Sequence, residues 1–223
     1  MRSSSLSSLF GDLDVEAEHD VQIGAQTWYG IGGRADLLLR PRSVDALATL
    51  VHRCHRSGTP LNVLGSGANV LVADEGVNGV VVRLDLPAFK TTDYNPEGEV
   101  EAVLAMAGVD LARLLMDTAR RGLEGLSHMA GIPATVGGAL RMNAGGAFGE
   151  IGDTVRRVTC ISRRGEIVSY PASEIDFEYR STNIPDPIIV SGVFDLTPTD
   201  PIALRNRIKE IFAFKKSDRK SVV

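Results

Sequence analysis

The segment Met129-Ala-Gly-Ile-Pro-Ala-Thr-Val-Gly-Gly-Ala-Leu-Arg-Met-Asn-Ala-Gly145 is the part around which the remainder of the chain is organised. Glycine and other small or apolar residues dominate it, and Arg141 carries its only charge. Such a run has too few large side chains to form a core of its own. Its glycines let the backbone approach a flat or anionic ligand with free N–H groups. The same composition suits a packed turn between two elements, so this segment alone leaves both interpretations open.

A second glycine-rich segment, Gly65-Ser-Gly-Ala-Asn69, lies between short apolar runs at residues 61–64 and 70–72. We interpret these runs as two strands joined by a hairpin. A dinucleotide-binding turn would have glycine at position 70 and would open a helix, but this sequence has valine there. Successive backbone N–H groups in such a loop can form a concave donor nest for a diphosphate, and the serine and asparagine add donors. An ordinary tight hairpin would not need two glycines, a serine and an asparagine within five residues.

The bulk composition excludes several classes of protein. With 223 residues, 43% of them hydrophobic, the chain can bury a core as one large domain or two small ones. A net charge of −4 argues against a general nucleic-acid binder. No apolar run approaches the length of a membrane span, so we expect a soluble, cytoplasmic protein that does not bind membranes.

The cysteines and histidines do not predict a metal site. Cys54 and Cys160 are far apart in the sequence, which favours reduced, buried thiols. His52 and His55 are three residues apart on a predicted helix, but no third ligand is near, and solvated surface histidines are the interpretation we favour.

Hydrophobic periodicity predicts alternating strands and helices in two halves, with a polar connection over residues 87–98 as the boundary. Helices are expected over residues 43–57 and 110–121, capped by Ser43 and Asp110, and over 202–215. In the last helix Leu204, Ile208, Ile211 and Phe212 are expected to face inward. Strands are expected over residues 36–40, 61–64, 70–72, 77–85, 99–107, 155–162, 166–170 and 188–196.

Four segments stand out in the sequence: Thr27-Trp-Tyr-Gly-Ile-Gly-Gly33, Val63-Leu-Gly-Ser-Gly-Ala-Asn-Val-Leu-Val72, Gly131-Ile-Pro-Ala-Thr-Val-Gly-Gly-Ala139 with Met142-Asn-Ala-Gly145, and Phe177-Glu-Tyr-Arg-Ser181. In this order and spacing they resemble the flavin-binding part of the UDP-N-acetylenolpyruvoylglucosamine reductases, with agreement from about residue 25 to residue 223. The resemblance implies an α+β fold, the two-subdomain FAD-binding fold of the vanillyl-alcohol oxidase/PCMH type. We expect a disordered leader over 1–20, subdomains over 21–87 and 88–217, and the start of a further C-terminal domain at 218–223.

The resemblance also implies a reaction. FAD is the cofactor, NADPH reduces it, and hydride passes to the enolpyruvyl group of a UDP-sugar to give UDP-N-acetylmuramate for peptidoglycan synthesis. The protein is expected to be a monomer. Residues 65–70 would bind the pyrophosphate, and residues 131–145 would wrap the isoalloxazine and its linker. The cofactor contacts so implied are Gly65, Ser66, Gly67, Ala68, Asn69, Val70, Gly131, Ile132, Pro133, Thr135, Val136, Gly138, Ala139, Asn143, Ala144 and Val193.

Arg180 matches the catalytic arginine of these reductases, and Tyr179 lies beside it. Hydride addition to the enolpyruvyl group builds negative charge on the adjoining carboxylate, which a guanidinium can meet with two parallel hydrogen bonds. The alternative for Arg180 is a surface pair with Glu178 or Asp176.

The sequence departs from the resemblance at its end. The reductases continue into a substrate-covering domain with a serine that protonates the enolate carbon and a late glutamate, whereas neither Ser217 nor Ser221 sits in the expected motif. We therefore expect the chain alone to hold flavin and to be nearly inactive in the complete reaction. A different oxidoreductase on the same scaffold and a flavin-binding protein without catalysis are the alternatives.

Overall fold

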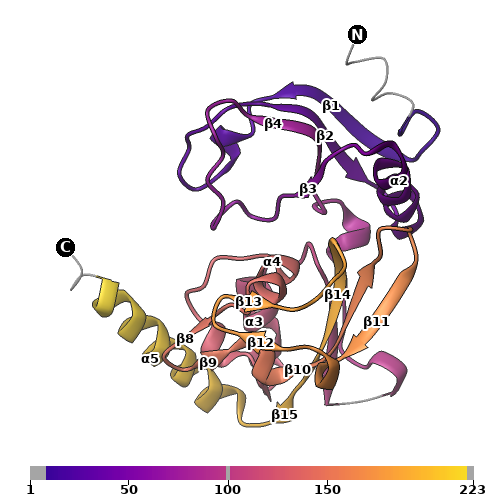
Figure 1. Ribbon diagram of the computed structural model, residues 1–223. Coiled ribbons are helices and arrows are strands. Elements are labelled where there is room, and N and C mark those ends of the chain that lie inside the picture. The colour runs from indigo at the N-terminus through magenta and orange to yellow at the C-terminus, as the bar shows by residue number, and fades with distance from the viewer. Residues whose placement is uncertain (1–8, 99–100, 220–223) are drawn as a thin grey trace.

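The computed structural model describes residues 9–98 and 101–219, and its strands form two larger sheets that lie one above the other in Figure 1. The first sheet has the strand order β1-β2-β4-β3. β1 is antiparallel to β2, and β2 and β3 are both parallel to β4. The four strands are β1 (Val15–Val21), β2 (Ala35–Pro41), β3 (Leu61–Val63) and β4 (Val77–Val82).

Helix α2 (Val44–Ser57) covers one face of this sheet and has the predicted ends. The Ser43 hydroxyl accepts a hydrogen bond from the Ala46 N–H, and Gly58 ends the helix in the left-handed conformation with φ of 65°. β2 is buried on both faces. Leu37 and Leu39 pack with α2, while Leu38 belongs to a smaller cluster on the opposite face, as expected for a continuous apolar run in a central strand.

Two sequence predictions for this sheet were wrong. Residues 15–20, assigned to a disordered leader, form β1, and residues 1–8 of that leader lie outside the described chain. Glu16 and Glu18 of β1 form ion pairs with Arg42, beside β2, and Arg40, on β2. The strand does alternate, with Val15, Ala17 and Val21 between acidic residues, but it is mostly exposed and acidic, and that composition favoured a leader. The strand expected at 70–72 is also absent there, because parallel β3 and β4 need a crossover connection rather than a hairpin.

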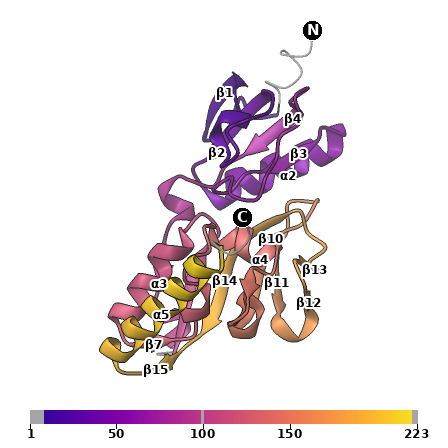
Figure 2. The same ribbon diagram turned by 90° about the vertical axis from the view of Figure 1, so that its left-hand side faces the viewer.

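The second sheet has the order β11-β10-β14-β6-β5, and every neighbouring pair in it is antiparallel. Figure 2 shows α3 (Leu111–Arg120) and α5 (Pro201–Arg219) packed beside each other at this sheet. α4 (Val136–Arg141) packs on β14. The strands are β5 (Thr92–Asp93), β6 (Ala102–Met106), β10 (Val155–Ile161), β11 (Ile167–Pro171) and β14 (Ile188–Asp195).

Short elements complete the second half. Two-residue strand pairs are formed by β7 (Leu123–Glu124) with β15 (Thr197–Pro198), β8 (Gly145–Gly146) with β9 (Gly149–Glu150), and β12 (Phe177–Glu178) with β13 (Ser181–Thr182). Single 3-10 turns occupy Gly24–Gln26, Pro87–Phe89, Pro96–Gly98, Ser127–Met129, Ile151–Thr154 and Ala172–Glu174.

The predicted inward face of α5 is partly wrong. Leu204, Ile208 and Ile211 are buried as expected, but the Phe212 side chain is 53% exposed. Those three residues recur at helical spacing and cover the core by themselves, so the next position along the helix turns outward. The Phe212 ring instead lies against Gly131, where an added Cβ would come within 3.3 Å of it.

Candidate functional site

Two adjoining hollows lie between the sheets and form one cleft. The larger, of about 790 Å³, is bordered by residues 65–70 from the first half and by residues of the 131–147 segment from the second. The smaller, of about 380 Å³, is bordered by Arg83, Asp85 and Lys90 and by residues 107–110. Both hollows share Val63, Gly65, Ser66, Thr135, Gly138 and Arg141. The two glycine-rich segments of the sequence thus meet in space.

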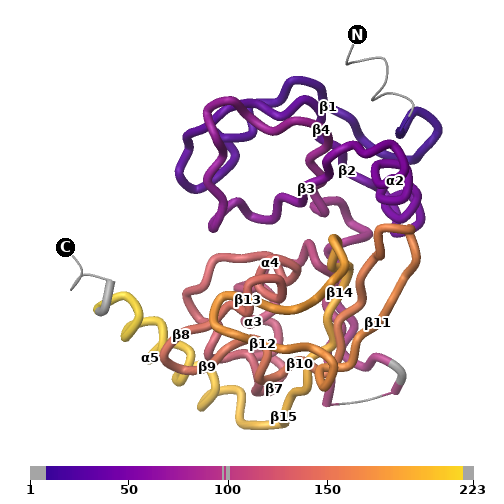
Figure 3. Tube along the Cα trace, in the orientation of Figure 1, coloured from indigo at the N-terminus to yellow at the C-terminus, as the bar shows by residue number. Residues whose placement is uncertain are grey.

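The loop at residues 65–70 offers unused backbone donors. Among the hydrogen bonds of the described residues, none uses an N–H group of this loop as donor, although Trp28 N–H donates to the Gly67 carbonyl at 3.0 Å. Gly67 has φ of +72°, and an added Cβ would lie 2.8 Å from the Gln26 carbonyl oxygen. The loop begins the connection from β3 to β4, which passes above α4 in the view of Figure 3. These features suit a loop whose N–H groups face an anionic ligand.

Helix α4 lies within residues 131–145, the segment that the resemblance assigns to the isoalloxazine and its linker. The Thr135 hydroxyl caps it by accepting from the Gly138 N–H at 3.4 Å. Gly137 allows close approach to the second sheet, because its N–H donates to the Ala107 carbonyl at 2.9 Å and an added Cβ would meet the Ala107 methyl at 2.8 Å. A Cβ at Gly65 would likewise lie 2.7 Å from Thr135 Oγ1, so the loop and the helix cap touch where the hollows join.

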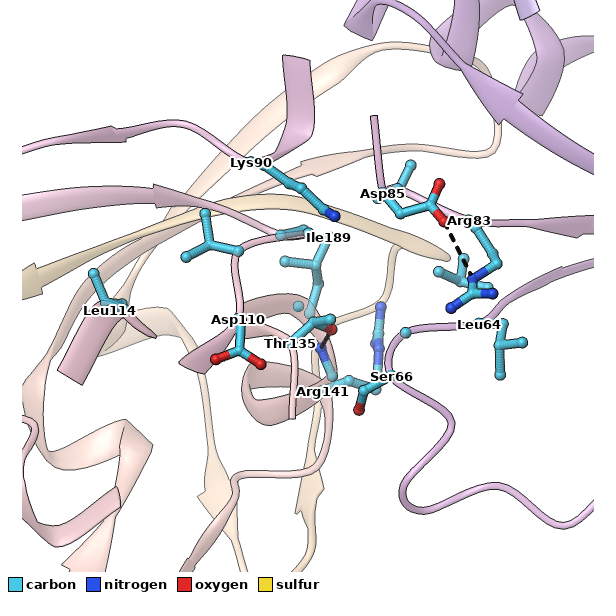
Figure 4. Close-up of a pocket in the computed structure, with 18 of the residues that line it drawn as sticks. Leu64, Ser66, Arg83, Asp85, Lys90, Asp110, Leu114, Thr135, Arg141 and Ile189 are labelled. Carbon is cyan, nitrogen blue, oxygen red and sulfur yellow. Dashed lines mark hydrogen bonds and ion pairs between the residues drawn. The ribbon is translucent and has the colours of Figure 1, made fainter. Parts of the chain in front are cut away.

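Arg141 brings a positive charge to this junction. Figure 4 shows its side chain beside Ser66 and Thr135. One Nη donates to the Ile184 carbonyl at 2.8 Å and the other to the Asp186 carbonyl. Burial lowers the pKa of Arg141, but the guanidinium stays charged at neutral pH. Within the described chain it makes no direct ion pair with a carboxylate, although the nearby Asp186 carboxylate raises its pKa. Arg141 borders both hollows, where its charge can meet an anion.

The smaller hollow has a mixed polar lining. Arg83 and Asp85 form an ion pair at 3.6 Å, and Arg83 also donates to the Gln26 side chain at 2.6 Å. Lys90 and Asp110 lie on other sides of the hollow (Figure 4), and Asp110 caps α3 by accepting from the Arg113 N–H at 2.8 Å. Leu114 and Ile189 supply apolar wall, so the hollow can take a ring system with polar edges.

Arg180 borders the larger hollow from the turn between β12 and β13. Its φ of +59° is a conformation rare for arginine, and its guanidinium carbon lies 5.6 Å from the centre of the Tyr179 ring. The ion pair with Glu178 or Asp176 considered from the sequence is not formed in the described structure. Tyr179 is 82% exposed and lines neither hollow.

Most residues predicted to contact the cofactor border the cleft, and three do not. Val136 and Val193 are buried in the core, and Asn143 is buried with its side-chain amide bonded to protein atoms. Those that line the larger hollow are Gly65, Ser66, Gly67, Ala68, Asn69, Val70, Gly131, Ile132, Pro133, Thr135, Gly138, Ala139 and Ala144.

Sequence reasoning missed several lining residues. Arg141 is the lone charge in a glycine-rich run, and Trp28 is the single tryptophan of the chain. Each of these features could have identified its residue as a candidate for the site. Phe214 and Lys215 of α5 also border the larger hollow, but nothing in the local sequence distinguishes them from other helix-surface residues.

The cysteines, the possible metal ligands and the helices were also considered as the basis of a site. Cys54 and Cys160 are free and buried, and burial raises their pKa values to about 11 and about 12. The described residues contain no cluster of three or more His, Cys, Asp or Glu that could hold a metal ion. A membrane-crossing helix is likewise not found in the part of the chain that the structure describes.

Comparisons with known proteins place this cleft in context. The family model of the FAD binding domain matches residues 35–170. The UDP-N-acetylenolpyruvoylglucosamine reductase of Syntrophus aciditrophicus is 38% identical over 200 residues, which are 89% of this chain and 64% of that protein. The crystal structure of UDP-N-acetylenolpyruvylglucosamine reductase from Thermus caldophilus aligns with a TM-score of 0.76 and 33% identity, over 91% of this chain and 69% of that one.

A more distant structure shares the fold alone. A variant of the BBE-like 1 protein of Physcomitrella patens aligns with a TM-score of 0.64 at 16% identity, over 86% of this chain and 44% of that chain. The fold is therefore the two-part FAD-binding fold of the vanillyl-alcohol oxidase/PCMH type, as predicted. The chain spans less than two thirds of the length of the Syntrophus relative.

Proposed function

We propose a function from the premise that the chain belongs to the UDP-N-acetylenolpyruvoylglucosamine reductase family and carries its FAD-binding domain. The proposed activity is reduction of the enolpyruvyl group of a UDP-sugar to UDP-N-acetylmuramate, with NADPH as the source of hydride. The observation that supports it most is the meeting of two glycine-rich segments from different sheets at one cleft, beside two arginines. A monomeric protein in the cytoplasm is part of the proposal, as are two subdomains that divide at residue 87, with β1 from residue 15 added to the first.

The residues of the cleft fit FAD, which has an anionic centre and a ring system at each end. We assign the diphosphate to the junction of the hollows. There the free N–H groups of residues 65–70 can donate to it, and Arg141 can balance its charge. The isoalloxazine is assigned to the larger hollow, which Arg180 borders, and the adenosine to the smaller one. When bound, FAD supplies the relay of hydride from NADPH to the substrate.

Arg180 is assigned to the substrate carboxylate. Its guanidinium borders the larger hollow without a carboxylate partner in the described chain, so it can offer two parallel N–H donors to an incoming carboxylate. Hydride adds to the terminal carbon of the enolpyruvyl double bond, so the electron pair of that bond moves to the carbon that bears the carboxylate and spreads onto the carboxylate oxygens. A fixed cation stabilises the charge that develops there. The same side chain orients the enolpyruvyl group toward the ring that the larger hollow would hold.

The two half-reactions, measured separately, test the proposal. The FAD-loaded chain is reduced with NADPH in the absence of oxygen and then mixed with the enolpyruvyl UDP-sugar, while flavin absorbance is followed and the product is identified by mass. We expect both steps in wild type, with re-oxidation by the UDP-sugar measurable but slow, because the chain alone is expected to be nearly inactive in the complete reaction. In Arg180→Lys, re-oxidation by the UDP-sugar should slow about 10- to 100-fold, with little change in reduction by NADPH.

The matched control is Arg164→Lys, since Arg164 is exposed on the turn between β10 and β11, away from the cleft. It should leave both steps unchanged. Reduced flavin that the UDP-sugar never re-oxidises in wild type would contradict the proposed activity. Equal slowing of both steps in Arg180→Lys would contradict the role given to Arg180.

A further inference from the structure

We infer that Asn143 is a positioning residue for Arg180: its buried amide holds the β12–β13 hairpin in place through the Glu178 carbonyl. The inference rests on the proposed function in that Arg180 is taken to meet the substrate. It differs from the sequence-based expectation, which counted Asn143 among the cofactor contacts.

The Asn143 side chain is fully engaged with protein atoms. It is 1% exposed, and its Nδ2 donates to the Glu178 carbonyl at 3.0 Å and to the Glu150 carboxylate. Its Oδ1 accepts from the Gly152 N–H at 3.2 Å. Both donor hydrogens of the amide therefore have acceptors, and no donor remains for a ligand. The neighbours Met142 and Ala144 line the cleft, but Asn143 does not.

The hairpin that bears Arg180 needs an external anchor. β12 and β13 are two residues each, with the pairs Phe177↔Thr182 and Glu178↔Ser181. An isolated hairpin of this length is not stable in water. The turn also holds Arg180 at φ of +59°, which costs free energy that the surroundings must offset. The bond from Asn143 reaches Glu178, the last residue of β12 and two residues before Arg180.

The second arm of the hairpin is tied to the same segment. The Thr182 hydroxyl donates to the Arg141 carbonyl at 3.3 Å, and the Arg141 guanidinium donates to the Ile184 carbonyl at 2.8 Å. Arg141 and Asn143 thus hold opposite arms, and both lie in the segment that forms one wall of the cleft. Of the two, Asn143 is the one whose side chain contacts the arm leading into the turn. Its bond sets where Arg180 stands relative to that wall.

Asn143→Asp tests this with little change of shape. Aspartate keeps the acceptor for Gly152 and tolerates the observed φ of +39°, but it removes the donor to Glu178. Trypsin cleaves after arginine, so cleavage at the Arg180–Ser181 bond reports how often the hairpin opens. The Arg164–Gly165 bond, in the turn after β10, is the internal reference. Cleavage at each bond is followed by mass spectrometry under conditions where both proteins are folded.

We expect cleavage at Arg180 to accelerate about tenfold in Asn143→Asp, the factor that one hydrogen bond is worth, with no change at Arg164. Asn143→Gly adopts the same backbone conformation without adding a charge beside Glu150, and it should behave alike, so it replaces the Asp variant if that variant does not fold. An unchanged ratio between the two bonds, or equal acceleration at both, would overturn the inference.

A measurement of the half-reactions distinguishes a specific effect on the position of Arg180 from a general loss of stability. In the FAD-loaded chain, Asn143→Asp should slow re-oxidation by the enolpyruvyl UDP-sugar and spare reduction by NADPH. In an Arg180→Lys background the Asn143 substitution should have little further effect, because both then act through one side chain. Additive effects would contradict the inference. If wild type shows no re-oxidation, the proposed function fails, and the proteolysis ratio still decides the role of Asn143.

Discussion

Gly65 and Thr135 touch across the cleft, where a Cβ added to Gly65 would lie 2.7 Å from Thr135 Oγ1. Gly65 follows β3 of the first sheet, and Thr135 caps α4 on the second, so this contact sets how closely the two halves approach. A side chain at position 65 must move the loop or the cap. Both border the site assigned to the FAD diphosphate.

Gly65→Ala should therefore weaken FAD binding about tenfold or more, measured by flavin fluorescence titration. The clash is with the hydroxyl oxygen, so the loss should be smaller in a Thr135→Ala background, where that atom is gone. Thr135→Ser keeps the oxygen and the cap and should give no relief. Thr135→Ala alone should lower the free energy of unfolding by about 0.5–2 kcal/mol through the lost cap. If Gly65→Ala lost the same FAD affinity in the Thr135→Ala and Thr135→Ser backgrounds, the contact with Thr135 Oγ1 would not be the cause of the loss.

Gly67→Val should abolish FAD binding. A branched side chain at this position meets the backbone of Gln26 and Thr27 at 2.8 and 2.9 Å and fills space beside the N–H groups of the loop. Gly58→Val is the matched control, because Gly58 has a similar φ of +65° with nothing within 4 Å of an added Cβ. It should lose stability from backbone strain and keep FAD binding. If Gly67→Val bound FAD with wild-type affinity, the assignment of the diphosphate to this loop would be wrong.

Arg141→Met should lower affinity for ADP by about ten- to a hundredfold and leave affinity for adenosine unchanged, because only ADP carries the diphosphate. Isothermal titration of both ligands measures the two effects. Arg141→Lys keeps the charge and should lose less. Since Arg141 also holds the Ile184 and Asp186 carbonyls, parallel losses for ADP and adenosine would reveal a structural role in place of the electrostatic one.

Tyr170 gives a pH-dependent contribution to stability. Its hydroxyl donates to the Asp186 carboxylate at 2.8 Å, and this bond raises the pKa of Tyr170 to about 12. A raised pKa means that the folded chain keeps its proton where the unfolded chain, near pH 10, has begun to lose it. The contribution is complete below pH 10 and is lost as pH rises toward 12.

Tyr170→Phe should thus lower the free energy of unfolding in urea by about 0.5–1.5 kcal/mol at pH 8, and this deficit should shrink by pH 11.5. Cys54 also titrates in this range, but it does so in both proteins and cancels in the difference. The Cys160 thiolate acts on Tyr170, so Cys160 is replaced by alanine in both proteins. A deficit that is the same at both pH values would contradict the assigned cause of the shift.

Local signals in the sequence predicted much of the fold. Ser43 and Asp110 cap α2 and α3 as expected, and the apolar run of β2 is buried on both faces. The failures have a common physical origin in contacts distant in sequence. β1 is held by its antiparallel pairing with β2, a strand that comes later in the sequence. The run at 70–72 buries Val72 as part of a loop, not as a strand.

The sequence predicted the parts of the candidate site that are formed by glycine-rich backbone. It did not predict the parts that form only when residues from both halves come together. Glycine-rich loops reveal themselves by composition, so residues 65–70 were assigned to the cleft they border. The smaller hollow joins residues from both halves, and no single segment carries its pattern. Asn143 lies in the segment predicted to bind the cofactor, but its amide donates to Glu178 and Glu150 and does not line the cleft.

Titration of the purified chain with FAD, followed by flavin fluorescence and then by competition with ADP, tests the central claim most directly. If the cleft between the two sheets is the FAD site, one FAD binds per chain and its fluorescence is quenched. ADP then competes with FAD for the junction at Gly65 and Arg141, so added ADP releases FAD and restores its fluorescence. FAD that does not bind, or that binds and is not displaced by saturating ADP, would contradict the assignment of the cleft.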